Sequence, residues 1–263
     1  MNKPLITAHS GCDDTLDGSI EAILTGIALG ADDVEVDVRH VEGFGLMLAH
    51  DQVADPSGLV ALKTAFAIIA EHPKVGINCD LKTYGLVHDV LNLAESMRLD
   101  ASRIALSGSL TPAELRRDPS IARRARVCLN IEEALCELML AGKRSDLHPW
   151  DVVRGQAGGP LCRWIDLLIE SLNGLGIEAL NLPPRPFIAE HLARLGESGV
   201  RISAWTINEE EAMRTLIALP YLVNLTTRRV ALAMSVRRQI IEGGTKHDDS
   251  ARNVPHHGPQ EIL

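Results

Sequence analysis

Two carboxylates and a histidine lie close together early in the chain, in a pattern that could support metal-dependent chemistry. Glu35 and Asp37 are separated by one residue within a run of alternating valines. Because a β-strand alternates its side chains between two faces, both acids point one way and the valines point the other. A second short apolar run then ends at His50. We therefore expect two acids and an imidazole at the ends of neighbouring strand segments.

A third acid follows in the next predicted strand, where Asp80 and Lys82 share one face. Three carboxylates within about 4–5 Å of one another would repel by roughly 3–4 kcal/mol per pair at an effective dielectric near 20. Either their pKa values rise and they share protons, or a cation lies among Glu35, Asp37 and Asp80. Lys82 could neutralise one charge only. Oxygen ligands favour a hard cation, so we expect Mg²⁺ or Ca²⁺, with Mn²⁺ as a further candidate.

Two histidines, His9 and His50, flank this acidic group. A hard cation beside two imidazoles and a lysine suits an oxyanionic substrate, above all a phosphate ester, whose oxygens the cation and Lys82 would hold. One histidine would take a proton from the attacking oxygen and the other would give one to the leaving oxygen. Which histidine is the acid stays open. A lone histidine would more often be a hydrogen-bonded structural residue, but the pair beside three acids favours a functional role.

Strand and helix signals alternate along the chain, which predicts parallel strands joined by helices. The predicted strands cover residues 5–8, 33–40, 76–82, 103–106, 126–131, 178–182, 201–207 and 222–226. Eight such units in 263 residues predict a closed (β/α)8 TIM barrel, a single domain over residues 1–241 with a flexible tail over 242–263. An open doubly wound sheet is the alternative, but no GxGxxG follows the first strand. In a barrel the polar residues at the strand ends would converge on one mouth.

Composition excludes several classes of protein. The net charge of −9 argues against nucleic acid as a partner. No apolar run approaches the ~18–20 residues of a membrane helix, and no signal peptide is evident, so we expect a cytoplasmic protein without a membrane span. Five cysteines without a CxxC spacing indicate buried thiols. The oligomeric state stays open, a homo-oligomer included.

One polar segment rich in glycine and proline, residues 142–160, interrupts the alternation. It carries Lys143, Arg144, His148 and Arg154. A segment of this length is either a functional loop that covers the mouth or an ordinary solvated loop.

The early motifs resemble the glycerophosphodiester phosphodiesterase family. That family carries His-Arg-Gly at the first strand, Glu-x-Asp on the second, His-Asp shortly after and Glu-x-Lys on the third. This chain has His9-Ser10-Gly11, Glu35-Val36-Asp37, His50-Asp51 and Asp80-Leu81-Lys82. Weaker matches at 204–208 and 225–227 extend the resemblance toward the C-terminus. It implies a TIM barrel that hydrolyses phosphodiesters of glycerol or a similar polyol.

The resemblance also implies roles for single residues. Glu35, Asp37 and Asp80 would be the metal ligands, and His9 and His50 the acid–base pair. Lys82, Ser10 and Trp205 would contact the phosphate or the rest of the substrate.

The chain departs from the family pattern at several positions. Ser10 replaces an arginine that would clamp the phosphate through two donors. Asp17 and Asp80 are each one methylene shorter than the usual glutamate. The family's small insertion after His-Asp is missing, since few residues separate Asp51 from Ser57, so the mouth should be more open on that side. We interpret these changes as altered substrate choice, for example a sugar-phosphate diester of the agrocinopine opine type.

The predicted function is therefore metal-dependent hydrolysis of a small-molecule phosphodiester to a phosphomonoester and an alcohol. Attack by a neighbouring hydroxyl, giving a cyclic phosphate, and direct attack by water both remain open. Two other hypotheses compete: a metal-dependent sugar isomerase or epimerase barrel, and a non-catalytic protein that binds phosphate esters.

Overall fold

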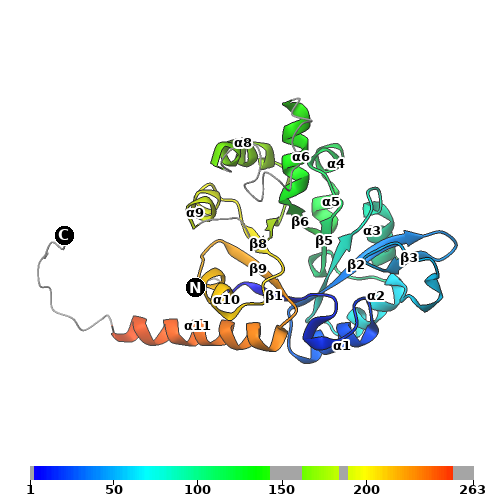
Figure 1. The fold of residues 1–263 in the computed structure, drawn as a ribbon, viewed down its shortest axis with the longest axis horizontal. Helices are drawn as coiled ribbons and strands as arrows, with labels where there is room; N and C mark the ends of the chain where they lie inside the picture. The colour runs from blue at the N-terminus through cyan, green and yellow to red at the C-terminus, as the bar shows by residue number, and fades with distance from the viewer. Residues whose placement is uncertain (1–2, 143–161, 184–188, 251–263) are drawn as a thin grey trace, which may run out of the picture.

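The strands close into a barrel, as the sequence predicts. The computed structural model describes residues 3–142, 162–183 and 189–250, and its nine-stranded sheet has the order β1-β9-β8-β7-β6-β5-β4-β2-β3 (Figure 1). All neighbouring pairs except β2–β3 are parallel, and β1 also pairs with β2, which closes the ring without β3. The ring strands are β1 (Leu5–Ala8), β2 (Asp33–Val41), β4 (Gly76–Leu81), β5 (Ile104–Gly108), β6 (Arg126–Asn130), β7 (Ala179–Leu182), β8 (Ile202–Ala204) and β9 (Leu222–Thr227).

Helices follow the strands and cover the outside of the barrel (Figure 1). The α-helices are α1 (Ile20–Ala28), α2 (Leu62–Glu71), α3 (Val87–Ser96), α4 (Pro112–Arg117), α5 (Ile121–Arg124), α6 (Ile131–Ala141), α8 (Cys162–Leu172), α9 (Ala189–Glu197), α10 (Glu210–Ile217) and α11 (Val230–Ser250). Short 3-10 helices are η1 (Cys12–Asp14), η2 (Pro56–Gly58) and η3 (Ala101–Arg103). Local sequence sets several of these starts: α4 begins with a capping box between Thr111 and Glu114 and with proline at its first turn.

Both faces of β2 are buried over residues 33–38, so this part of the strand is not a solvent-exposed edge. Val34, Val36 and Val38 are each at most 1% exposed, and Val34 lies beneath α1, close to Gly26. Glu35 and Asp37, on the other face, are only 6% and 4% exposed. The apolar core therefore fills the space between barrel and helices, whereas the acids point into the barrel.

Two local features differ from the predicted elements. The apolar run before His50 forms β3 (Gly45–Leu48), an antiparallel partner of residues 38–41 of β2 in a hairpin (Figure 1). The amphipathic spacing of residues 57–71 predicts a helix from Ser57, but α2 begins at Leu62. Pro56 and the Asp55 carboxylate, which accepts the Ser57 N–H, fold residues 56–58 into η2.

The apolar spacing predicts a last helix over residues 230–241, but the C-terminal helix is longer. Helix α11 continues through Ser250, so residues 242–250 of the expected tail are helical, and the helix extends beyond the body of the barrel (Figure 1). An existing helix propagates at little cost, and its glycines disfavour it by only about 1 kcal/mol each. Residues 143–160 of the polar segment, with its four basic side chains, lie outside the described residues. No helix of the described part of the chain is long and apolar enough to cross a membrane.

Candidate active site

A cavity of about 300 Å³ opens where the barrel strands end at their carboxyl side. Its lining includes six of the residues that the sequence singled out: His9, Glu35, His50, Asp80, Lys82 and Trp205. Glu35 and Asp80 lie in β2 and β4. His9, Lys82 and Trp205 directly follow β1, β4 and β8, and His50 lies two residues after the end of β3. The mouth of the barrel therefore brings together side chains that lie up to 196 residues apart, from His9 to Trp205.

The three acids form one cluster. One carboxylate oxygen from each of Glu35, Asp37 and Asp80 lies within 4.8 Å of the other two. The register of β2 and β4 explains this, because Asp37 pairs with Asp80 across the strands and Glu35 lies two residues deeper on the same face. Three oxygen donors this close, largely shielded from water, are a donor set suited to a hard divalent cation.

Lys82 bridges two of these acids. Its Nζ atom lies 2.8 Å from Asp37 Oδ1 and 2.5 Å from Asp80 Oδ2. Burial alone would lower the pKa of Lys82, but Asp80 and Asp37 outweigh burial and raise it, so the ammonium stays charged. One positive charge faces three acidic groups, and the cluster retains a negative excess that a divalent ion could balance.

The pKa of Glu35 reflects its burial and the excess negative charge of the cluster. Burial, followed by the charges of Asp37 and Asp80, raises the pKa of Glu35 well above its usual value. The backbone N–H of Ser10 donates to Glu35 Oε2 at 2.9 Å, and His9 Nδ1 lies 3.8 Å from the same oxygen. Either a proton on Glu35 or a further cation beside it would relieve this repulsion. A divalent ion shared by the three carboxylates could supply that charge.

Asp80 is oriented by a second set of contacts. Ser107 Oγ donates to Asp80 Oδ1 at 2.8 Å, and Asn78 Nδ2 donates to Ser107 Oγ at 3.0 Å. Gly108 lies against the same carboxylate with a φ of +81°, and a Cβ there would lie 2.6 Å from Asp80 Oδ1. Hydrogen bonds and close packing thus fix the direction in which Asp80 presents its oxygens.

The two histidines differ in environment. His9 is largely buried, and its Nδ1 donates to the Ser10 carbonyl at 2.8 Å, which leaves Nε2 as the acceptor nitrogen of the neutral ring. Burial lowers the pKa of His9, and the charge of Arg228 contributes in the same direction. The His50 side chain is 63% exposed, and its Nδ1 lies 3.0 Å from Asp51 Oδ1. The cavity therefore joins a shielded imidazole and a solvent-exposed one.

Ser10 and Trp205, expected at the substrate, occupy different positions. Ser10 is buried, and its hydroxyl accepts the Gly18 N–H at 2.7 Å, so it ties down the loop after β1 and does not line the cavity. Trp205 does line the cavity, and its indole Nε1 is buried without a hydrogen-bond partner among the described residues.

Sequence reasoning missed two groups near the mouth. Arg228, directly after β9, lines the cavity and forms an ion pair with Asp17. Glu132, two residues after β6, accepts from Asn130 Nδ2 at 2.8 Å, and burial raises its pKa to about 7. Both follow the carboxyl end of a strand, and this position was the available signal for each.

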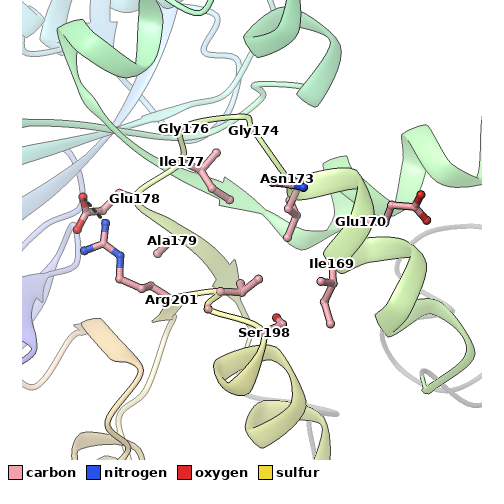
Figure 2. Close-up of a pocket in the computed structure, with 13 residues that line it drawn as sticks. Ile169, Glu170, Asn173, Gly174, Gly176, Ile177, Glu178, Ala179, Ser198 and Arg201 are labelled. Carbon is pink, nitrogen blue, oxygen red and sulfur yellow. Dashed lines mark ion pairs between the residues drawn. The ribbon is translucent and has the colours of Figure 1, made fainter.

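A second cavity, of about 390 Å³, lies at the opposite end of the barrel (Figure 2). Its walls are the segments that precede β7 and β8, and Glu178 and Arg201 form an ion pair there at 3.1 Å (Figure 2). Its described lining includes Glu170 and Glu178 but no histidine. The chemical groups of the described residues gather at the mouth, where TIM barrels carry their active sites.

Comparison with known proteins supports the fold assignment. No family model and no curated protein matches the sequence. Among solved structures, the chain is similar to a glycerophosphodiester phosphodiesterase from Thermotoga maritima (TM-score 0.62, 16% identity, 90% of this chain and 99% of that one). A second such enzyme, from Parabacteroides distasonis, gives a TM-score of 0.62 at 14% identity, with 92% and 99% covered.

A third similar structure is an Oleispira antarctica phosphodiesterase in complex with its product sn-glycerol-3-phosphate (TM-score 0.61, 15% identity, 89% and 96% covered). Identities this low establish the shared barrel and leave the chemistry to be argued from the site. The resemblance seen in the sequence motifs is thus confirmed at the level of the fold.

Proposed function

We propose that this protein is a divergent glycerophosphodiester phosphodiesterase that hydrolyses a small-molecule diester to a phosphomonoester and an alcohol. One observation carries the proposal: the acidic cluster of Glu35, Asp37 and Asp80 shares a single mouth with His9 and His50. The similar solved structures support it, because they include glycerophosphodiester phosphodiesterases that cover nearly the whole chain.

Glu35, Asp37 and Asp80 would hold the divalent ion, and their carboxylate oxygens suit Mg²⁺, Ca²⁺ or Mn²⁺. When bound, the ion would supply positive charge to the phosphoryl oxygens as negative charge develops on them. Lys82, on the cavity wall, keeps its own charge and orients Asp37 and Asp80. The ammonium would also lie within reach of a phosphoryl oxygen at the same wall.

The two histidines would divide the proton transfers. His9 is neutral near pH 7 because its pKa is lowered, and its Nε2 can accept the proton of the attacking oxygen. His50, held by Asp51 at the exposed rim, would give a proton to the leaving alcohol oxygen. Asp51 would orient the ring of His50 through the 3.0 Å contact of its Oδ1 with Nδ1.

The cavity also limits the substrate. About 300 Å³ accommodates a small polar diester of a polyol or sugar, and the remaining wall carries hydroxyl and amide groups, Thr226 and Asn181, that suit hydroxyl-rich alcohols. A sugar-phosphate diester of the opine type stays within this class.

Phosphorus NMR on a panel of glycerophosphodiesters and sugar-phosphate diesters tests the proposal. We expect turnover with Mg²⁺, Ca²⁺ or Mn²⁺ and loss of turnover in EDTA, and Glu35→Gln should abolish the metal-dependent rate. Binding of the same diesters without turnover would instead favour a non-catalytic binding protein. Proton exchange at a sugar carbon, with no need for phosphate, would favour an isomerase.

A further inference from the structure

Arg228 lies at the mouth although nothing in the early motifs marks it. It follows β9 directly, and the backbone pairing of β1 with β9 places it beside His9, whose N–H donates to the Thr227 carbonyl at 2.9 Å. Its own backbone is held on both sides: its N–H donates to Asn208 Oδ1 at 2.9 Å, and its carbonyl accepts the Asp13 N–H at 2.7 Å. The side chain therefore starts from a fixed point next to one of the two histidines.

The guanidinium of Arg228 is held by Asp17. Arg228 Nη1 lies 2.9 Å from Asp17 Oδ1, and Nη2 donates to Asp17 Oδ2 at 3.2 Å. Both side chains are partly exposed, 40% for Arg228 and 53% for Asp17, and such pairs add little to stability. Two of the five guanidinium N–H groups face Asp17, so the others remain available to a ligand in the cavity that Arg228 lines.

The pair is packed closely onto the loop after β1. Gly11 has a φ of +71°, and a Cβ at this position would lie 2.0 Å from Asp17 Oδ1 and 2.7 Å from Arg228 Nη1. The backbone of the loop and the carboxylate together restrict the arginine before any ligand binds. Less side-chain entropy is then lost when the guanidinium contacts a ligand.

Lys82 and Arg228, two basic side chains that line the cavity, have different partners. Lys82 is engaged by Asp37 and Asp80, whereas Arg228 stands on the wall beside His9 with its outer donors unused by the contacts described above. A planar guanidinium matches the oxygens of a phosphoryl group through two parallel hydrogen bonds. An anionic phosphodiester in this mouth would therefore meet Arg228 in addition to Lys82.

We propose that Arg228, held in place by Asp17, is a phosphate-binding residue of this cavity, with a guanidinium that donates to the non-bridging oxygens of the phosphodiester. The inference rests on the proposed function for its substrate class. The residue after β9 would then supply a positive charge to the phosphate. Ser10, in the loop after β1, cannot do so, because its hydroxyl contacts Gly18 and does not line the cavity.

Calorimetric binding of sn-glycerol 3-phosphate and of inorganic phosphate to the full-length chain, with Mg²⁺ present, tests the proposal. We expect Arg228→Gln to weaken binding of both anions by about 10- to 100-fold, the range for a lost charge-assisted hydrogen bond. Arg228→Lys should recover part of the loss. Arg229→Gln is the matched control, because this neighbour is exposed and does not line the cavity, yet it carries the same charge.

Each variant is also titrated with Mg²⁺ alone and checked by thermal unfolding, so that a general loss of structure is recognised. Equal phosphate binding by Arg228→Gln and Arg229→Gln would overturn the assignment while diester hydrolysis by the wild type still supported the proposed function. Loss of phosphate binding in Arg228→Gln, with no hydrolysis by the wild type, would support the assignment and overturn the proposed function. Absence of phosphate binding by the wild type would also overturn the assignment, whereas the proposed function is decided by diester hydrolysis alone.

Discussion

Lys82 Nζ lies 2.5 Å from Asp80 Oδ2, so a metal-ligand candidate already has a cation as its neighbour. The same ammonium contacts Asp37 at 2.8 Å. The lysine therefore stabilises the three carboxylates when no ion is bound and would compete with a divalent ion for Asp37 and Asp80. This dual role gives opposite expectations for stability and for metal affinity, and the two can be measured separately.

Lys82→Met should lower the free energy of unfolding in EDTA by about 3 kcal/mol, because removing one partner of a buried ion pair leaves uncompensated charge. Added Ca²⁺ should restore more stability in the variant than in the wild type, because the cluster then lacks its competing cation. Urea unfolding with EDTA and with Ca²⁺ measures both effects. Lys63→Met, at an exposed position of α2, is the control. An equal response of Lys82→Met and the wild type to Ca²⁺ would contradict this reading of the cluster.

Gly108 offers a test of how packing orients Asp80. Alanine at Gly108 would place Cβ 2.3 Å from the Leu81 carbonyl oxygen and 2.6 Å from Asp80 Oδ1. Gly85 has nearly the same positive φ, +85° against +81°, but its Cβ would meet nothing within 4 Å. Both alanine variants bear the backbone cost of about 1–2 kcal/mol. Only Gly108→Ala should also weaken Ca²⁺ binding, by about 10-fold or more, in calorimetric titration. Equal Ca²⁺ affinities would show that Asp80 is not a ligand or that it adjusts freely.

Much of the candidate site could be predicted because its residues follow the two-residue alternation of side chains along strands. The alternation of β2 put Glu35 and Asp37 on one face, and the convergence of parallel strands at one barrel end brought Asp80 to them. Neither step needs long-range information. The barrel itself was predictable for the same reason, since each strand–helix unit is local and the closure of eight units follows from their number.

Other features depend on contacts that a sequence does not display. Arg228 and Asp17 are 211 residues apart and meet only because β1 and β9 pair to close the ring. Ser10 lies just after β1, but its hydroxyl points to Gly18 rather than to the cavity. The position of a residue in a motif does not give the direction in which a loop side chain points. The polar composition of residues 242–250 predicts a tail, but α11 continues through them because an existing helix propagates at little cost.

Glu132 should make the stability of the protein fall with rising pH. Burial raises the pKa of Glu132 to about 7 from a usual value of 4.5, so the folded state holds a proton in this window that the unfolded state has released. The free energy of unfolding then decreases as the pH rises from about 4.5 to 7. Glu132→Gln removes this dependence and should be more stable than the wild type above pH 7, by up to about 3 kcal/mol. Urea unfolding at several pH values from 5 to 8 is the measurement, with Glu21→Gln on the exposed side of α1 as the control. A difference between Glu132→Gln and the wild type that stays constant with pH would show that Glu132 is ionised throughout.

His9 gives the most direct test of the proton transfers. His9→Ala should reduce diester turnover by about 100- to 10,000-fold, the range for loss of a general acid or base, while Mg²⁺ affinity measured by calorimetry changes little. His40→Ala is the matched control, because His40 is exposed on β2 and does not line the cavity.

His50→Ala should lose most of its turnover rate on diesters whose leaving alcohol is poor. A good leaving group such as 4-nitrophenolate needs no proton from the protein. Turnover of bis(4-nitrophenyl) phosphate by His50→Ala, beside its failure on a glycerol diester, would assign His50 to the leaving oxygen. Equal losses on both substrates would contradict that assignment and move His50 to another step.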